Sequence, residues 1–232
     1  MTSVTILSGG AAQGLVRGLS ETFKAQTGSG IDGEYGAVGI MADKLRASTP
    51  ADLVILTQAL LAKLAAEKLV VPSSIADIGR VETALAVRSR DPKVTVKTEA
   101  DLREVLRGAD AIFAPDIKAS TAGQHVAKVL DRLGIAYEVA SRLKIFPNGA
   151  AAMRELAAST AKRPIGCTQA TEIIATDGIA LSGSLPPGCE LVTMYTAGVT
   201  ALATHPTEAA ALIALLTGAD HKELRRRVGF AG

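Results

Sequence analysis

The chain has 232 residues, 48% hydrophobic and 21% charged, and its 25 Lys and Arg residues nearly balance its 23 Asp and Glu residues, for a net charge of +2. So small and scattered a positive charge excludes the basic stripe of a nucleic-acid-binding surface, and with 3% aromatic residues and no Trp there are few platforms on which bases could stack. No apolar run reaches the roughly 20 residues of a membrane-spanning helix, so we expect neither a nucleic-acid partner nor insertion into a membrane.

The N-terminus and the cysteines leave two questions open. The first apolar run, residues 4–7, follows Met1 without a basic region or a cleavage site in front of it. The location is therefore periplasmic if a signal peptide has been removed, and cytoplasmic if Met1 is the native start. Cys167 and Cys189 form neither a disulfide framework nor a metal spacing, so we expect buried free thiols, no metal and no cofactor.

The first third of the chain repeats one pattern: a short β-branched run, a turn of small or hydroxyl residues, and an amphipathic stretch. In the first repeat a strand over residues 4–7 is followed by apolar residues at helical spacing and by a closing Gly28. The second repeat predicts a strand over 31–35, and the third predicts a nearly continuously apolar strand over 52–56, each followed by a helix. The pattern is therefore that of consecutive βα units.

A second βα series follows an extended run over residues 75–88 that has no helical period. Its predicted strands cover 111–114, 143–146 and 165–167. Its predicted helices cover 99–107, a stretch that ends at Gly134, and 150–158. After another extended run over 191–203, two helices over 209–216 and 222–228 end the chain.

Two βα series and two extended connectors predict an α/β fold with two lobes and a ligand cleft between them. We expect the chain to cross between lobes near residues 80–83 and near 190–193. The predicted boundaries are 1–81 for the first part of lobe 1, 82–191 for lobe 2, and 192–232 for the return to lobe 1.

The candidate site follows from where the turns fall. In a parallel sheet the carboxyl ends of the strands and the N-termini of the following helices share one edge, and ligands bind there. The free N–H groups of a first helical turn, with the positive end of the helix dipole, favour an anion. Taken alone, each turn is more typical of an ordinary helix cap, and the hypothesis depends on their convergence. The candidate ligand-binding residues are Ser8, Gly9, Gly10, Ala11, Ala37, Val38, Gly39, Thr57, Gln58, Lys118, Ser120, Thr121, Ala122, Asn148, Gly149, Cys167, Thr168 and Gln169.

These segments resemble the substrate-binding proteins of molybdate ABC transporters, which have a type II periplasmic-binding-protein fold. The similar segments are residues 4–13, 35–39, 50–56 and 120–123, together with the final helices, and they occur in the same order over nearly the whole chain. The resemblance implies two lobes that close on a small oxyanion by a hinge motion, and an ABC transporter permease as a possible partner.

Three side-chain donors that the resemblance implies are missing. The family places serines in the first two turns and a tyrosine on a later strand, and the matching positions here are Ala11, Val38 and Cys167. This pattern is closer to a branch that resembles aconitate isomerase, a binding-protein-like enzyme that moves a double bond in a tricarboxylate. The basis is the glycine-rich first turn, residues 54–57 and residues 166–169.

We therefore expect a binding protein for a small anion, with an organic carboxylate preferred to molybdate or tungstate. The alternatives are an aconitate-isomerase-like enzyme and an intracellular ligand sensor. Isomerisation needs a general acid and base, and the sequence offers Lys118, Glu34 and Tyr35. Cys167 has no evident histidine partner for nucleophilic chemistry, and we expect a helical-face role for His125.

Overall fold

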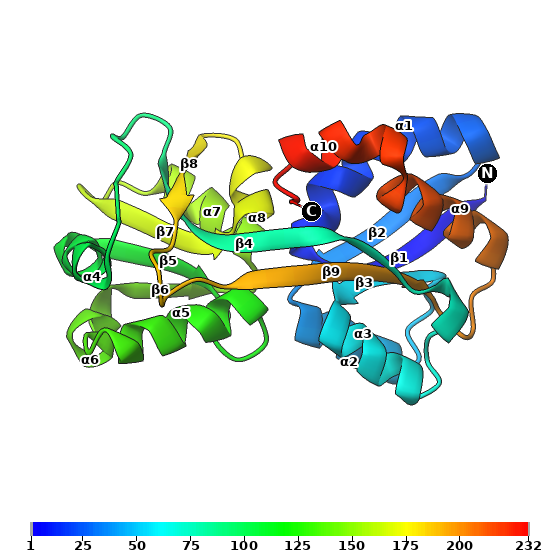
Figure 1. Cartoon of the computed structure of the whole chain (residues 1–232), viewed down its shortest axis with the longest axis horizontal. Coiled ribbons are helices and arrows are strands. Elements are labelled where there is room, and N and C mark those ends of the chain that lie inside the picture. Colours follow the sequence, from blue (N-terminus) through cyan, green and yellow to red (C-terminus); the bar gives the residue numbers. More distant parts are fainter. Residues whose placement is uncertain (1, 232) are drawn as a thin grey trace. The chain divides into compact units, whose positions relative to one another are not determined.

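The computed structural model describes residues 2–231, which form two compact units. Unit 1 comprises the residues up to Val81 together with those from Thr193 onward, and unit 2 comprises Glu82–Val192. The chain enters unit 2 within strand β4 (Ala76–Arg88) and returns at the start of β9 (Val192–Val199). Each unit is a β-sheet with helices on its faces, so the predicted α/β class is confirmed (Figure 1).

The sheet of unit 1 has a parallel core of three strands. Strand β1 (Ser3–Gly9) pairs in parallel with β2 (Gly30–Gly36) on one side and with β3 (Leu53–Thr57) on the other. Strand β9 then pairs antiparallel with β3, which gives the order β2-β1-β3-β9. Residues Leu53 to Leu56 are all buried, as expected for an inner strand with both faces covered.

Five helices cover the two faces of this sheet. Figure 1 shows α1, α9 and α10 on one face and α2 and α3 on the other. In α1, Leu15, Leu19 and Phe23 face the core, and Gly28 closes the helix in the left-handed conformation (φ 71°) that favours glycine. The bounds are Gln13–Thr27 for α1, Val38–Arg46 for α2, Gln58–Ala66 for α3, Pro206–Thr217 for α9 and Lys222–Arg227 for α10.

The sheet of unit 2 also has a parallel core. Strand β5 (Ala111–Pro115) pairs in parallel with β6 (Leu143–Phe146) and with β7 (Pro164–Gln169). Strand β4 pairs antiparallel with β7 and with β8 (Ile179–Ser184). The inner strands β5 and β7 are buried along their whole length.

Helices lie on both faces of the second sheet as well. In Figure 1, α7 and α8 lie on one face, and α5 and α6 on the other. Leu102, Val126, Leu130, Ile112 and Ile165 belong to one buried cluster that joins the helices to the strands. The bounds are Glu99–Gly108 for α4, Thr121–Arg132 for α5, Ala136–Val139 for α6, Gly149–Ala158 for α7 and Ala170–Ile174 for α8.

The expected strands and longer helices are present, and short elements account for the differences. Strand β8 was not expected, because its sequence Ile-Ala-Leu-Ser-Gly-Ser is only half-buried and resembles a loop. The four-residue helix α6 and the five-residue helix α8 are too short to show a helical period in the sequence. These elements depend on tertiary pairing more than on their own composition.

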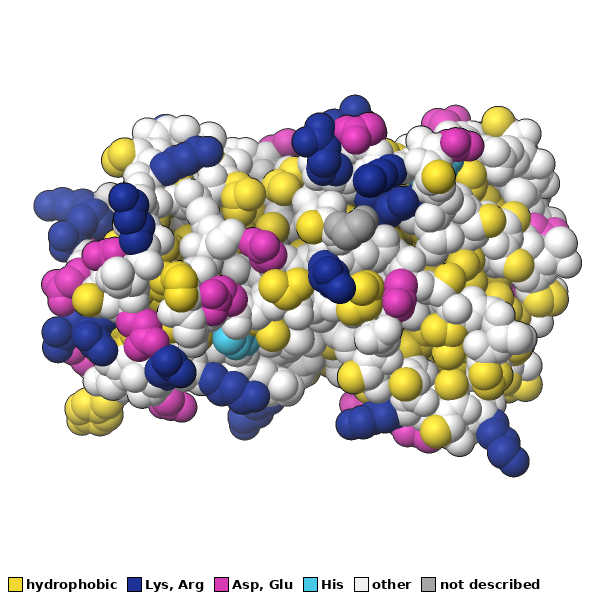
Figure 2. Space-filling view, in the orientation of Figure 1, with side chains coloured by type: hydrophobic (Ala, Val, Ile, Leu, Met, Phe, Trp, Pro, Cys, Tyr) yellow, Lys and Arg dark blue, Asp and Glu magenta, His cyan; other side chains and the backbone are white. Residues whose placement is uncertain are grey.

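The surface is of mixed charge. Figure 2 shows basic and acidic side chains scattered over the visible face of the molecule. Among residues 2–231, no helix combines the length and the apolar character that crossing a bilayer requires.

A buried carboxylate anchors the amino edge of the first sheet. Asp52, just before β3, is 1% exposed and accepts hydrogen bonds from the backbone and hydroxyl of Thr5 (2.9 and 3.0 Å), those of Thr204 (2.8 and 3.0 Å) and the His205 amide (2.9 Å). Burial by itself raises the pKa of Asp52, but the donated hydrogen bonds outweigh it and hold the pKa well below the ordinary value. Asp52 thus joins β1, β3 and the loop that leads to α9.

We predict that Asp52→Asn lowers the free energy of unfolding at pH 7 by about 2 to 4 kcal/mol, because an amide leaves several buried donors without a charged acceptor. Since the folded pKa is depressed, this contribution is present above the ordinary carboxyl pKa of about 3.9 and is lost as the pH falls below it. Urea unfolding at pH 7 and pH 3 measures both effects. The exposed Asp220→Asn in unit 1 is the control, with an expected change within about 0.5 kcal/mol. An equal, small change in both variants would contradict the anchoring role.

Candidate functional site

The turns of unit 1 lie at one sheet edge because the strands before them are parallel and in register. Ser8 pairs with Tyr35 of β2 and with Ile55 of β3. The strands therefore end at nearly the same level, and η1 (Gly10–Ala12) with α1, α2 and α3 start there. We call this the carboxyl edge of unit 1.

The first turn is tightly packed against the second. A Cβ on Gly9 would lie 2.8 Å from Val38 Cγ1 and 3.1 Å from Tyr195 Cε1, so only glycine fits there without a shift. The buried Ser8 hydroxyl donates a hydrogen bond to the Gly9 carbonyl at 2.9 Å. Ala11 is also buried. This turn therefore presents backbone at the edge, and its serine hydroxyl is engaged within the chain.

The second and third turns use extended residues as N-caps. Ala37 precedes α2 and Thr57 precedes α3, with ψ values of 134° and 146°. Within residues 2–231, no N-cap side chain makes a capping bond at the starts of η1, α2 or α3. Helix α1 continues directly from η1, and its first amide, that of Gln13, donates to the Gly10 carbonyl. We call the three starts of η1, α2 and α3, which include Gly10 and Gly39, the open starts of unit 1. The Gln58 side chain contacts the Asp77 carboxylate at 3.3 Å, so it is directed along the protein surface.

The open starts have the chemistry of an anion site. The first turn of a helix has N–H groups without partners inside the helix, and they carry the positive end of its dipole. Because the parallel register collects the open starts at one edge, they can act on one bound group. They can bind a carboxylate or an oxyanion through main-chain donors alone.

Unit 2 presents a second edge of the same kind, but its turns are capped by side chains. Pro115 of β5 is level with Phe146 of β6, so α5 and α7 start at one edge, the carboxyl edge of unit 2. Before α5, the Ser120 hydroxyl accepts from the Gly123 amide at 3.4 Å. The Thr121 and Ala122 positions open this helix, and Ala122 is buried.

The loop before Ser120 is held by an aspartate. Asp116 Oδ1 accepts from the amides of Lys118 (2.7 Å) and Ala119 (2.8 Å). The Lys118 side chain is exposed. His125 lies one turn into α5 and its Nε2 is 2.8 Å from the Cys189 carbonyl oxygen, which gives this histidine a bond within unit 2.

The start of α7 is filled by the protein itself. The Asn148 side chain accepts from the Ala151 amide at 2.8 Å. The carboxyl group of Glu172, from α8, accepts a hydrogen bond from the Thr168 hydroxyl at 2.6 Å, and the amides of Gly149, Ala150 and Gln169 face it. The start of α7 thus faces an internal carboxyl group.

Cys167 lies inside β7 and is not a reactive thiol. It belongs to the buried cluster of unit 2, and burial raises its pKa to about 12. A thiol with such a pKa stays protonated at neutral pH and is a weak nucleophile. Cys189 is also free and buried in the same cluster.

Two residues at these edges have no signal in the sequence. Tyr195 of β9 is opposite Thr57 of β3, is 3% exposed, and packs over Gly9. Glu172 looks like an ordinary polar residue after a predicted turn.

Tyr35, a candidate from the sequence, has its hydroxyl group directed back over Gly33. Burial, and to a smaller extent the charge of Asp32, raises the pKa of Tyr35 to about 12.

The edges hold no cluster suited to a metal. In the part of the chain that the structure describes, no group of three or more His, Cys, Asp or Glu side chains is placed to bind a metal ion.

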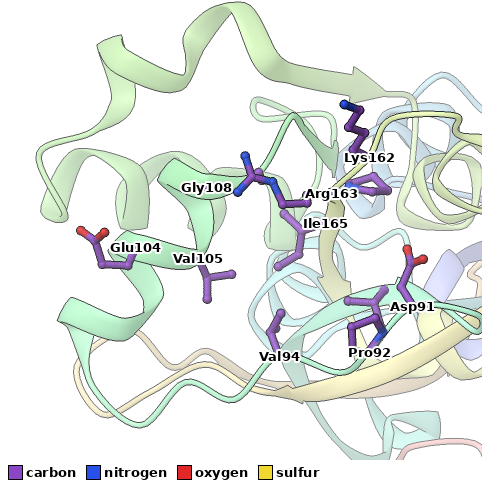
Figure 3. A pocket seen from close by; sticks show the side chains of 12 residues that line it. Asp91, Pro92, Val94, Glu104, Val105, Gly108, Lys162, Arg163 and Ile165 are labelled. Carbon is purple, nitrogen blue, oxygen red and sulfur yellow. The ribbon is translucent and has the colours of Figure 1, made fainter.

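A separate pocket of about 530 Å³ lies at the opposite, amino edge of unit 2. It is formed where β7 begins, and Figure 3 shows Val94, Val105 and Ile165 around it. Asp91 at its rim is paired with Arg88 at 2.6 Å. Its position at the other ends of the strands separates it from the turns described above.

The comparison with known protein families matches residues 4–231 to the model of the bacterial extracellular solute-binding proteins. The chain belongs to this family. The expected resemblance to transporter solute-binding proteins is thereby confirmed, and so is the expected two-lobed type of fold.

One relative of this solute-binding protein is an aconitate isomerase from a Pseudomonas species. The two sequences are 26% identical over 231 residues, which cover 95% of this chain and 84% of the isomerase.

Three solved structures share the fold. The periplasmic molybdate-binding protein of Azotobacter vinelandii has a TM-score of 0.81 and 17% identity, with 99% of each chain covered. The sulfate-binding protein of Mycobacterium tuberculosis has a TM-score of 0.76 and 20% identity, covering 99% of this chain and 86% of that one. PEB3 with bound L-phospholactate has a TM-score of 0.70 and 16% identity, with 99% of each chain covered. At these identities the likeness establishes the fold.

Proposed function

We propose that this solute-binding protein binds a small organic carboxylate through helix N-terminal amides at its carboxyl edges. The observation that carries the proposal is the convergence of the open starts at the carboxyl edge of unit 1. We propose an ABC transporter permease as the partner that receives the ligand, as the family resemblance implies.

The energies of the open starts suit a small anion. One helix terminus stabilises an anion by about 0.3 to 1 kcal/mol, and by up to roughly 2 kcal/mol in a partly buried site. Three such starts, with direct hydrogen bonds from their amides, approach the roughly 8 kcal/mol of micromolar binding. The main chain of unit 1 can therefore supply much of the affinity without a basic side chain.

Side-chain chemistry supports a carboxylate over molybdate. Ala11 and Val38 occupy the positions at which the molybdate-binding family has serines, and the Ser8 hydroxyl is bonded to Gly9. A tetrahedral oxyanion would thus have few hydroxyl donors here. PEB3 shows that this fold is found with an organic anion, L-phospholactate. Molybdate stays an alternative because the Azotobacter vinelandii protein has the highest TM-score of the three structures.

A second candidate function is isomerisation of a tricarboxylate. The aconitate isomerase relative, similar over 95% of this chain, supports it. Moving a double bond requires a proton donor and a proton acceptor near one substrate carbon. Lys118 and Glu172 are the titratable side chains at the unit 2 turns that could take part, one exposed and one buried.

We predict that citrate or aconitate raises the midpoint of thermal unfolding at lower concentrations than molybdate, tungstate or sulfate. A ligand at a hundred times its dissociation constant adds about 2.7 kcal/mol to the free energy of unfolding. Thermal-shift titrations of the whole chain, at constant ionic strength, provide the ranking. Stabilisation by molybdate and tungstate alone would show that the carboxylate assignment is wrong.

The role of main-chain donors can be tested at the start of α3. We predict that Thr57→Asp weakens anion binding at least about tenfold, because the new carboxylate occupies the N-cap of an open start. Thr57→Asn is the matched control: it caps the same helix without a charge and should have the smaller effect. Both variants should keep or raise the unfolding midpoint. Equal affinities for the two variants, measured by calorimetry, would remove α3 from the site.

For the second candidate, ultraviolet absorbance distinguishes turnover from binding. If the chain is an isomerase, micromolar protein should interconvert cis- and trans-aconitate, and Lys118→Ala or Glu172→Gln should reduce the rate at least about a hundredfold. Heat-inactivated protein is the control. Binding of aconitate without interconversion would leave the transport role and discard the isomerase.

A further inference from the structure

Glu172 is a buried carboxyl group that the proposed binding mode does not use. It is 6% exposed and lies in α8, directly after the carboxyl end of β7. Burial raises the pKa of Glu172 above the ordinary value, and the lowering by the hydroxyl and amide donors around its carboxyl group is smaller. A carboxyl group in such surroundings is costly unless its oxygens are fully bonded, and here four donors face it.

The first turn of α7 faces polar groups of the chain itself. The Ala151 amide donates to the Asn148 side chain at 2.8 Å, and the amides of Gly149 and Ala150 face the Glu172 carboxyl group. These three amides have no partner inside the helix, whereas the Ala152 amide makes the first bond of the helix itself, to the Asn148 carbonyl at 3.1 Å. The position an external anion would take at α7 is therefore occupied by a side chain.

The start of α7 is packed closely against Glu172. A Cβ on Gly149 would lie 1.9 Å from Glu172 Oε2 and 2.2 Å from Thr168 Oγ1. The glycine at this position therefore serves the internal carboxyl group. The open starts of unit 1 differ from this arrangement, because no N-cap side chain bonds to their first amides.

We propose that Glu172 is a specificity-determining residue, which takes the α7 amides for the protein itself and withholds them from the ligand. The inference rests on the proposed function. A tetrahedral oxyanion needs donors on all its sides, whereas a carboxylate ligand presents its charge at one end. With α7 closed by Glu172, an anion at the carboxyl edge of unit 2 does not find the first amides of α7 available as donors. Glu172 thus selects against compact tetrahedral anions.

The experiment compares the whole chain with Glu172→Ala and Glu172→Gln. The matched control is Glu155→Ala, which removes a carboxylate from the exposed face of α7 itself. Calorimetry at constant ionic strength gives affinities for sulfate, molybdate, citrate and aconitate. Thermal unfolding with formate or acetate, against chloride, tests whether a small free carboxylate fills the space that the alanine leaves.

We expect Glu172→Ala to gain about tenfold or more in affinity for sulfate or molybdate relative to citrate, because three amides and one hydroxyl become available. Formate should raise its unfolding midpoint saturably, with no such effect on the unchanged chain or on Glu155→Ala. Glu172→Gln should show a smaller change in the same direction. If Glu172→Ala folds poorly, formate in the refolding buffer should restore it.

Two results would overturn the inference: an unchanged ranking of anions in Glu172→Ala, or failure of both variants to fold even with formate. Failure of the proposed function gives a different result, which is seen in the unchanged chain: it would then bind none of the four anions, or only sulfate and molybdate.

Discussion

The parallel pairing of β1 with β2 and β3 is the constraint on which the candidate site depends. Backbone hydrogen bonds fix the register, so Ser8, Tyr35 and Ile55 lie at one level near the carboxyl ends of their strands. The helices that follow must then begin at one edge, with their unpaired amides and positive dipole ends close together. The proposed site for negative charge is built in this way from the main chain, with no need for an arginine or lysine.

Helix starts with similar turn sequences satisfy their amides in different ways. At α4, a capping box of Thr98 and Asp101 pairs the donors locally. At α7, the donors are paired by Asn148 and by Glu172 from another helix, while α2 and α3 follow Ala37 and Thr57 without such side-chain bonds. Small and polar turn residues therefore indicate where a helix begins, and tertiary contacts decide whether its amides can serve a ligand.

Much of the architecture could be predicted from the sequence, since its signals are local. The β-branched runs predict the inner strands, apolar spacing predicts α1, and the closing Gly28 has the expected left-handed conformation. Strand β8 could not be predicted, because pairing with β4 stabilises a half-polar segment. The contacts of Tyr195 with Gly9 and of Glu172 with Gly149 join segments far apart in sequence, which a single sequence does not reveal. The positions of the turns could therefore be predicted, but not which side chains contact them.

The fold alone does not determine the ligand. Three proteins that share this fold at 16–20% identity are described with molybdate, sulfate and L-phospholactate as their ligands. An aconitate isomerase is a relative over most of the chain. Selectivity on such a fold has to come from the few side chains that fill or leave open each turn. In this chain those positions carry mainly alanine, valine and glycine in unit 1, and a buried carboxyl group in unit 2. On the proposed function, this distribution of charge and space sets the choice among anions.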